Sequence, residues 1–176
     1  MKLLVFTRGE IAARACASAR ALGVPNVLFV SSAELDAPAV AYADALHVVD
    51  AEDRAGTFLS LDALTDAIAA TSATHVYAGY GFLSESASLA RAVTDAGARF
   101  VGPSADVLAA LADKARARDF AESAGLSHLG LPLDAPPVDA YPLVLKATAG
   151  GGGRGNLVVA SKDALEDAKV TLAARA

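Results

Sequence analysis

The chain has 176 residues, of which 54% are hydrophobic and 20% are charged, and its formal net charge is −5. This length accommodates one full domain with a sizeable core and part of a second domain. The acidic balance excludes a general binder of nucleic acids or anionic membranes, although a local phosphate pocket is still compatible with it.

Short apolar segments alternate with alanine-rich helical segments over the first hundred residues. Strands are expected at residues 2–7, 27–31, 46–49, 75–78 and 99–102, and helices at residues 9–22, 61–70 and 86–96. Near-continuous apolar strands that alternate with helices are typical of a parallel sheet covered on both faces, so the fold class is α/β. The single cysteine, Cys16, excludes an internal disulfide framework and is expected to be a small buried residue of the first helix.

The pattern changes after Pro103. Helices are expected at residues 105–111 and 113–124, and a proline-rich irregular segment then leads to strands at residues 141–145 and 156–160 and a helix at residues 162–174. Two strands and one helix cannot cover both faces of a sheet, so this second module is expected to be incomplete. The sequence contains no secretory signal and no apolar segment long enough to span a bilayer, and a cytoplasmic location is expected.

The most informative segment is the glycine run between the last two expected strands, Lys-Ala-Thr-Ala-Gly-Gly-Gly-Gly-Arg-Gly at residues 146–155. Glycines allow several backbone N–H groups to approach one anion, and Lys146 and Arg154 flank them with positive charge. This combination favours binding of a polyphosphate such as ATP. The run also satisfies the dinucleotide-binding spacing G-x-G-x-x-G, but that motif must open into a helix, and a strand-like segment follows here.

Two other motifs follow expected strands of the first module. Thr-Arg-Gly-Glu-Ile-Ala at residues 7–12 is explained by turn and capping chemistry, with Glu10 favourable in the first helical turn. Gly-Tyr-Gly-Phe-Leu-Ser-Glu at residues 79–85 lies where open parallel sheets bind ligands, and it is equally compatible with an ordinary loop that ends in a serine cap. Lys114 opens an expected helix, where its charge opposes the helix dipole.

Together these motifs identify a family resemblance. The two motifs above, Phe-Val-Gly-Pro-Ser at residues 100–104, Asp-Lys at residues 113–114 and the glycine run occur in one order. This order and spacing resemble the N-terminal part of biotin carboxylase, the ATP-grasp component of acetyl-CoA, propionyl-CoA, pyruvate and urea carboxylases. The resemblance covers nearly the whole chain.

The resemblance implies a Rossmann-like pre-ATP-grasp domain at residues 1–104 and an incomplete ATP-grasp domain with a glycine-rich lid loop at residues 105–176. By motif position, Lys114, Lys146, Gly152 and Gly153 are implied to contact the nucleotide phosphates. The implied reaction is carboxylation of biotin, carried on a separate carrier protein, by bicarbonate and ATP through carboxyphosphate. The implied partners are the biotinyl carrier and a carboxyltransferase, with no nucleic acid and no membrane.

The chain also departs from the family pattern. Thr7 replaces the usual Asn, Tyr77-Ala78 replaces His-Pro, and Asn156 replaces Met. In the family, the Mg²⁺-binding carboxylates, the catalytic Glu, the bicarbonate-binding Arg and the adenine-contacting segment lie beyond the last residue of this chain. No catalytic residue or metal ligand is therefore assigned here.

Three hypotheses remain open from the sequence. The chain is the N-terminal portion of a biotin carboxylase, not competent alone, and a complementary chain would supply the rest. Alternatively, it is a non-catalytic remnant or interaction module that has lost ATP chemistry. The third hypothesis is a piece of another ATP-grasp ligase that activates a different carboxylate.

Overall fold

The computed structural model describes residues 1–50, 58–81, 83–127, 130–131, 136–147 and 155–174. The chain divides into two compact units, Met1–Ala109 and Ala110–Ala176, and each is described by itself. None of the helices formed by the described residues combines the length and apolar character needed to cross a membrane.

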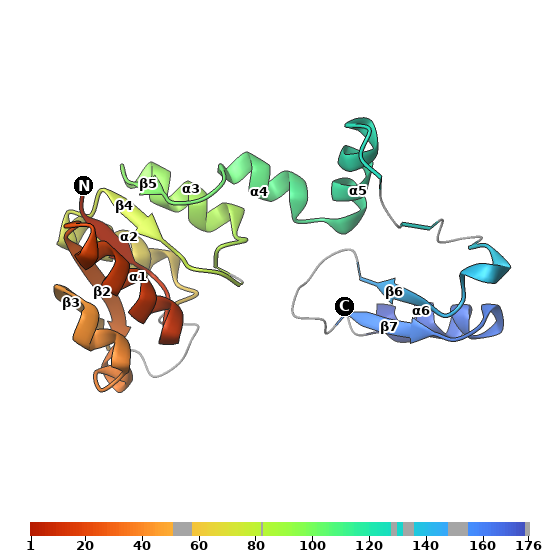
Figure 1. Cartoon of the computed structure of the whole chain (residues 1–176), viewed down its shortest axis with the longest axis horizontal. Coiled ribbons are helices and arrows are strands. Elements are labelled where there is room, and N and C mark those ends of the chain that lie inside the picture. Colours follow the sequence, from red (N-terminus) through yellow and green to blue (C-terminus); the bar gives the residue numbers. More distant parts are fainter. Residues whose placement is uncertain (51–57, 82, 128–129, 132–135, 148–154, 175–176) are drawn as a thin grey trace. The chain divides into compact units, whose positions relative to one another are not determined.

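The first unit is built on a five-stranded parallel sheet (Figure 1). Its strands are β1 (Leu3–Val5), β2 (Asn26–Ser31), β3 (Ala45–Val49), β4 (His75–Tyr77) and β5 (Arg99–Phe100). The strand order is β3-β2-β1-β4-β5, so the direction of winding reverses between β1 and β4. In open parallel sheets, ligands bind outside the carboxyl ends of the strands at this kind of switch point.

Helices cover both faces of this sheet, as the sequence predicts. The helices are α1 (Gly9–Ala21), α2 (Leu61–Thr71) and α3 (Ala87–Asp95). Alternate residues of β1 point to opposite faces: Val5 packs with residues of α1, whereas Leu4 packs with residues of α2 and α3. Serine caps begin α2 and α3, because Ser60 accepts a hydrogen bond from the Ala63 N–H and Ser86 from the Leu89 N–H, both at 3.1 Å.

An aromatic cluster fills the centre of the larger core. The ring centroids of Phe6 and Phe29 are 4.5 Å apart, and those of Phe29 and Phe58 are 5.5 Å apart, both in edge-on geometry. His47 stacks on Phe29 from β3 at 5.7 Å. Phe6 and Phe29 are each 1% exposed, so this cluster fixes the packing of β1 and β2.

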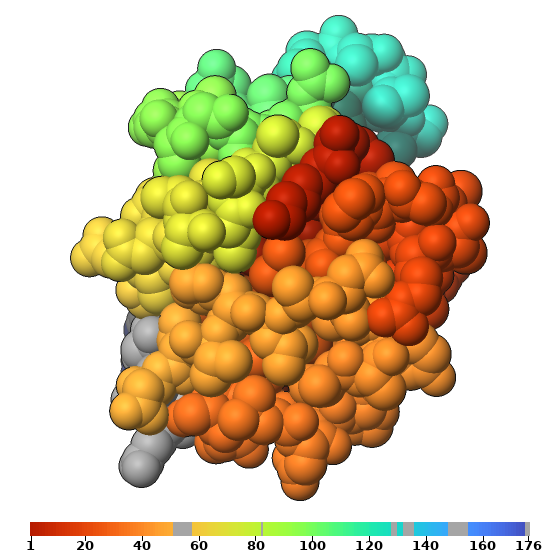
Figure 2. Space-filling view, turned by 90° about the vertical axis from the view of Figure 1, so that its left-hand side faces the viewer, coloured from red at the N-terminus to blue at the C-terminus, as the bar shows by residue number. Residues whose placement is uncertain are grey.

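One edge of the sheet is formed by β3, whose five residues include neither proline nor a formally charged side chain. Leu46 and Val48 pair in register with Leu28 and Val30 of β2, yet they are 38% and 47% exposed. The segment around β3, coloured orange, lies at the surface facing the viewer in Figure 2. An apolar edge of the sheet is therefore open to solvent.

The start of β2 is fixed by a polar contact with the residue that precedes β3. The Asp44 carboxylate accepts hydrogen bonds from the backbone N–H of Asn26 at 3.0 Å and from its side-chain amide at 2.7 Å. Arg20, at the end of α1, donates to the same carboxylate at 3.3 Å and to the Ala43 carbonyl at 2.9 Å. This network aligns α1, β2 and β3 at the amino edge of the sheet.

Cys16 is fully buried in the core beneath α1, in agreement with the sequence-based expectation. Burial, reinforced by the Asp44 charge, raises the pKa of the thiol from 9.0 to about 11. The resulting contribution to stability is present below the pKa of the unfolded thiol and is lost as the pH rises through about 11.

We therefore expect the folded chain to resist thiol reagents. At about pH 8, the raised pKa alone lowers the thiolate population roughly a hundredfold relative to an ordinary cysteine. Labelling with a disulfide reagent checks this expectation, with urea-unfolded protein as the control. Equal labelling rates in the folded and unfolded chain would contradict the buried position.

Two helices follow the sheet: α4 (Ala105–Leu111), which spans the division between the units, and α5 (Lys114–Ser123). Arg91 of α3 forms an ion pair with Asp106 at 2.8 Å, which ties the first turn of α4 to the first unit. No side chain of α4 or α5 is buried. The sequence predicts a domain boundary at residue 104, whereas the contacts divide at residue 109.

The second unit contains an antiparallel hairpin of β6 (Leu143–Lys146) and β7 (Asn156–Val159). One face of the hairpin packs against α6 (Leu165–Ala173), and the buried residues of this small core are Leu145, Val159, Leu165 and Leu172. The segment expected as one helix at residues 162–174 instead begins with a 3₁₀ turn, Lys162–Ala164. A strand follows the glycine run, so the dinucleotide-binding interpretation of G-x-G-x-x-G is wrong.

Candidate functional site

The carboxyl edge of the five-stranded sheet brings together the two motifs of the first unit. The motif at residues 7–12 leads from β1 into α1, and the loop at residues 79–85 follows β4. A backbone hydrogen bond of 2.8 Å from the Phe6 N–H to the Tyr77 carbonyl continues the β1–β4 pairing up to both motifs. The switch point of the sheet therefore lies between them.

Gly79 fits closely against the first motif. It has a φ of +72°, and a Cβ placed on it would lie 2.8 Å from Thr7 Oγ1 and 2.9 Å from Ile11 Cγ2. Both contacts are shorter than ordinary van der Waals distances, and the backbone conformation itself favours glycine. A glycine is required here because the loop passes directly over the start of α1.

Tyr80 makes a second contact between the two motifs. Its phenol O–H donates a hydrogen bond to Glu10 Oε1 at 3.1 Å, and this bond together with the Glu10 charge raises the pKa of Tyr80 above its ordinary value. The loop is also bonded internally, because the Ser84 hydroxyl donates to the Gly81 carbonyl at 2.7 Å. Phe82, the second aromatic residue of the motif, lies outside the described residues.

A hollow beside this loop lies at the carboxyl ends of β1 and β2, where Thr7, Gly9 and Phe58 contribute to its lining. Arg8 and Glu34 form an ion pair at the hollow, and the Arg8 guanidinium lies 5.7 Å from the centroid of the Phe58 ring. Arg8 is therefore held by a carboxylate and an aromatic face within the first unit.

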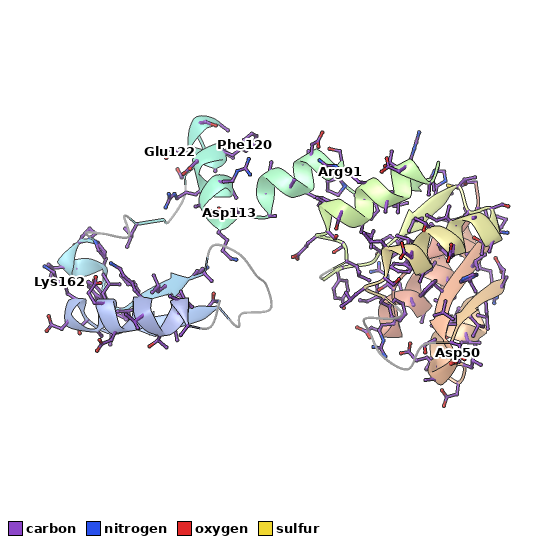
Figure 3. All side chains as sticks on the ribbon, turned by 180° about the vertical axis from the view of Figure 1, so that it is seen from behind. Asp50, Arg91, Asp113, Phe120, Glu122 and Lys162 are labelled. Atoms are coloured by element: carbon purple, nitrogen blue, oxygen red, sulfur yellow. The ribbon has the colours of Figure 1, made fainter. Side chains whose placement is uncertain are left out.

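In the second unit, Lys114 is the first residue of α5, as expected from the sequence. Asp113 caps this helix by accepting hydrogen bonds from the backbone N–H groups of Ala115 and Arg116, both at 2.9 Å. The carboxylate offsets the unfavourable placement of a lysine at a helix amino end. Figure 3 shows Asp113 at the start of α5, with Phe120 and Glu122 further along the same helix.

Lys146 is the last residue of β6 and is exposed on the hairpin face opposite the small core. It pairs across the hairpin with Asn156, and the next outward pair is Val144 with Val158. These two valines are 52% and 75% exposed. The outer face therefore combines an apolar surface with a cation at the base of the glycine run.

The glycine run itself is described only at its base. The Ala147 N–H donates to the Gly155 carbonyl at 2.8 Å, and a Cβ on Gly155 would lie 2.9 Å from Ala147 Cβ. Gly152 and Gly153, which the resemblance assigns to the phosphates, lie outside the described residues. Lys114 and Lys146 belong to separate elements of the same unit.

Residues 1–50, 58–81, 83–127, 130–131, 136–147 and 155–174 contain no group of three or more His, Cys, Asp or Glu side chains placed to hold a metal ion. The chemistry of the described site is therefore that of cations, backbone groups and an apolar sheet face. Sequence reasoning missed the contacts of Thr7 and Glu10 with the 79–85 loop, because the hexapeptide was fully explained by local turn and capping chemistry.

A parallel sheet with a ligand-type switch point, followed by a cationic glycine hairpin, defines the class of protein. Residues 1–108 match the family model of the biotin carboxylase N-terminal domain, and the chain belongs to this family.

Relatives of known function agree with this assignment. The biotin carboxylase of Haemophilus influenzae is 36% identical over 179 residues, covering 94% of this chain and 40% of the relative. The propionyl-CoA carboxylase alpha chain of Ruegeria pomeroyi is also 36% identical, covering 88% of this chain and 24% of the relative. The chain thus spans 40% or less of the length of these relatives.

Solved structures give the same result for the fold. The biotin carboxylase domain of the 2-oxoglutarate carboxylase of Hydrogenobacter thermophilus, in complex with MgADP, ADP and bicarbonate, has a TM-score of 0.88 at 30% identity. The match covers 99% of this chain and 40% of that one. The biotin carboxylase of Campylobacter jejuni, in complex with β-γ-ATP, also has a TM-score of 0.88 at 30% identity and covers 99% of this chain and 41% of its own.

Proposed function

We propose that this chain is the N-terminal portion of an ATP-dependent biotin carboxylase and supplies phosphate contacts for MgATP. In this proposal residues 1–104 are the pre-ATP-grasp domain, and residues 105–176 begin the ATP-grasp domain. The observation that carries the proposal is the exposed Lys146 at the base of the glycine run, on a hairpin face that also presents Val144 and Val158.

The physical roles of the site residues follow from their chemistry. Lys146 and Lys114 would neutralise phosphate charge, and the backbone N–H groups of Gly152 and Gly153 would approach the phosphates without steric hindrance from a Cβ. Because phosphoryl transfer depends on positioned charge and metal, these residues prepare the nucleotide rather than complete the reaction. A complementary polypeptide would supply the Mg²⁺ ligands and the catalytic groups.

The whole proposed reaction joins bicarbonate to biotin with cleavage of ATP, through carboxyphosphate. The biotin would be carried by a separate biotinyl carrier protein and passed on to a carboxyltransferase. Adding the complementary portion of a related biotin carboxylase is expected to give bicarbonate-dependent ATP hydrolysis. An inactive mixture would count against this part of the proposal.

Calorimetric titration with MgATP tests the nucleotide site directly. Loss of a charge-assisted phosphate contact in Lys146→Ala is expected to weaken binding roughly ten- to hundredfold. Lys162→Ala is the matched control, because Lys162 is an exposed lysine of the same unit on a different element (Figure 3).

Two outcomes of this titration would contradict the proposal. Equal weakening by Lys146→Ala and Lys162→Ala would reveal non-specific attraction of the anion. No binding by the unaltered chain would favour a non-catalytic module that has lost ATP chemistry.

A further inference from the structure

A side-chain contact joins two motifs that are 70 residues apart in the sequence. Glu10 is the second residue of α1, and its carboxylate accepts the phenol O–H of Tyr80 at 3.1 Å. Tyr80 is 67% exposed, so burial does not hold its ring in place. The orientation of this ring therefore depends on the Glu10 contact.

The rest of the loop is arranged so that this contact can act on it. Gly79 is seated against Thr7 and Ile11, which fixes the point where the chain leaves β4. Beyond Tyr80, the Ser84 N–H and hydroxyl both donate to the Gly81 carbonyl, at 3.0 Å and 2.7 Å. The loop is thus a short bonded turn that α1 holds at Gly79 and at Tyr80.

We propose that Glu10 is a positioning residue that holds Tyr80 and the 79–85 loop at the carboxyl edge of the sheet with the phenol proton directed to Glu10. The proposal rests on the proposed function, because the loop matters as a ligand-binding element of that enzyme. A phenol has one O–H donor, and Glu10 takes it, so the Tyr80 oxygen can only accept a hydrogen bond from a ligand. The matching ligand group is therefore an N–H or O–H donor rather than a carboxylate.

The charge of Glu10 also explains why the phenol stays protonated. The groups that act on Tyr80 are Glu10 from α1 and Tyr77 from β4, and both raise its pKa, the Glu10 hydrogen bond most strongly. A raised pKa means that the pair stabilises the folded loop fully below the ordinary tyrosine pKa. This stabilisation disappears as the pH rises through the pKa of the folded state.

Titration of tyrosinate absorbance tests the pair on the chain itself. The difference between the unaltered chain and Tyr80→Phe isolates the Tyr80 curve from those of Tyr42, Tyr77 and Tyr141. The Tyr80 midpoint is expected to fall in Glu10→Ala and to stay unchanged in Asp62→Asn, which removes a first-turn carboxylate from α2. An identical midpoint in Glu10→Ala and the unaltered chain would overturn the proposal.

Amide hydrogen exchange at Ser84 and Leu89 tests whether the pair orders the loop. Loss of the hydrogen bond in Glu10→Ala is expected to accelerate exchange about three- to tenfold, and Tyr80→Phe should do the same while keeping the aromatic ring. The double variant should be no faster than either single one, because both remove the same bond. Additive acceleration would show that the two side chains act separately and would overturn the proposal.

Glu10→Gln provides a second test that preserves the shape of the residue. Its amide oxygen can still accept the phenol O–H, so loop exchange should stay near that of the unaltered chain while the Tyr80 midpoint falls with the lost charge. None of these measurements uses nucleotide. Failure to bind MgATP would therefore overturn the proposed function alone, whereas an unshifted Tyr80 midpoint would overturn the role of Glu10 alone.

Discussion

Replacing Gly79 by alanine is expected to destabilise the five-stranded unit by about 2–4 kcal/mol. The added Cβ meets Thr7 Oγ1 and Ile11 Cγ2 at distances below 3.0 Å, and the φ of +72° is unfavourable for a residue with a side chain. Relief of the clash requires the loop to move away from α1. Urea unfolding followed by labelling of Cys16 measures the effect, because this thiol reports opening of the first unit.

Gly81→Ala separates the two causes. Gly81 has a φ of +92°, yet a Cβ there would meet no atom of the described structure within 4 Å. Its cost should be only the backbone term of about 1 kcal/mol. Equal destabilisation by both substitutions would show that Gly79 is not in close contact with the first motif.

Phe29→Ala is expected to cost about 3–5 kcal/mol of the same unfolding free energy. The ring is 1% exposed and touches Phe6, Phe58 and His47, so its removal leaves a cavity bordered by three rings that cannot close around it. Phe29→Leu keeps most of the volume and should cost about 1–1.5 kcal/mol.

Leu22→Ala serves as the surface control for this experiment, because Leu22 is 78% exposed at the end of α1. Its effect should stay within about 0.5 kcal/mol. A cost for Phe29→Ala as small as that of Leu22→Ala would mean that the aromatic cluster does not form the centre of the core.

Much of the fold could be predicted because its signals are local. The predicted helix at residues 105–111 matches α4, and the strand before the glycine run and the strand after it are both present as β6 and β7. Ser86 caps α3, one of two serines that the pattern left open. Apolar runs, caps and glycine stops each act within a few residues, so the sequence shows them directly.

Other elements depend on tertiary or turn geometry and could not be predicted. The 3₁₀ turns Ser32–Glu34 and Pro38–Tyr42 have no apolar periodicity, and the second of them packs beneath α1 through Ala39. For the site, motif order in the sequence predicts Lys114 and Lys146 through the resemblance. The Glu10–Tyr80 contact has no local signature, because it depends on β1 and β4 being neighbours in the sheet.

The open edge at β3 has a consequence for self-association. In an antiparallel pair of two copies centred on His47, Asp44 of each strand would lie opposite Asp50 of the other. Two like-charge pairs would then oppose the pairing that the uncharged strand otherwise invites. Acidification below about pH 4 protonates carboxylates and removes this repulsion. The two aspartates that end the strand thus act as a charge-dependent guard against growth of the sheet between molecules.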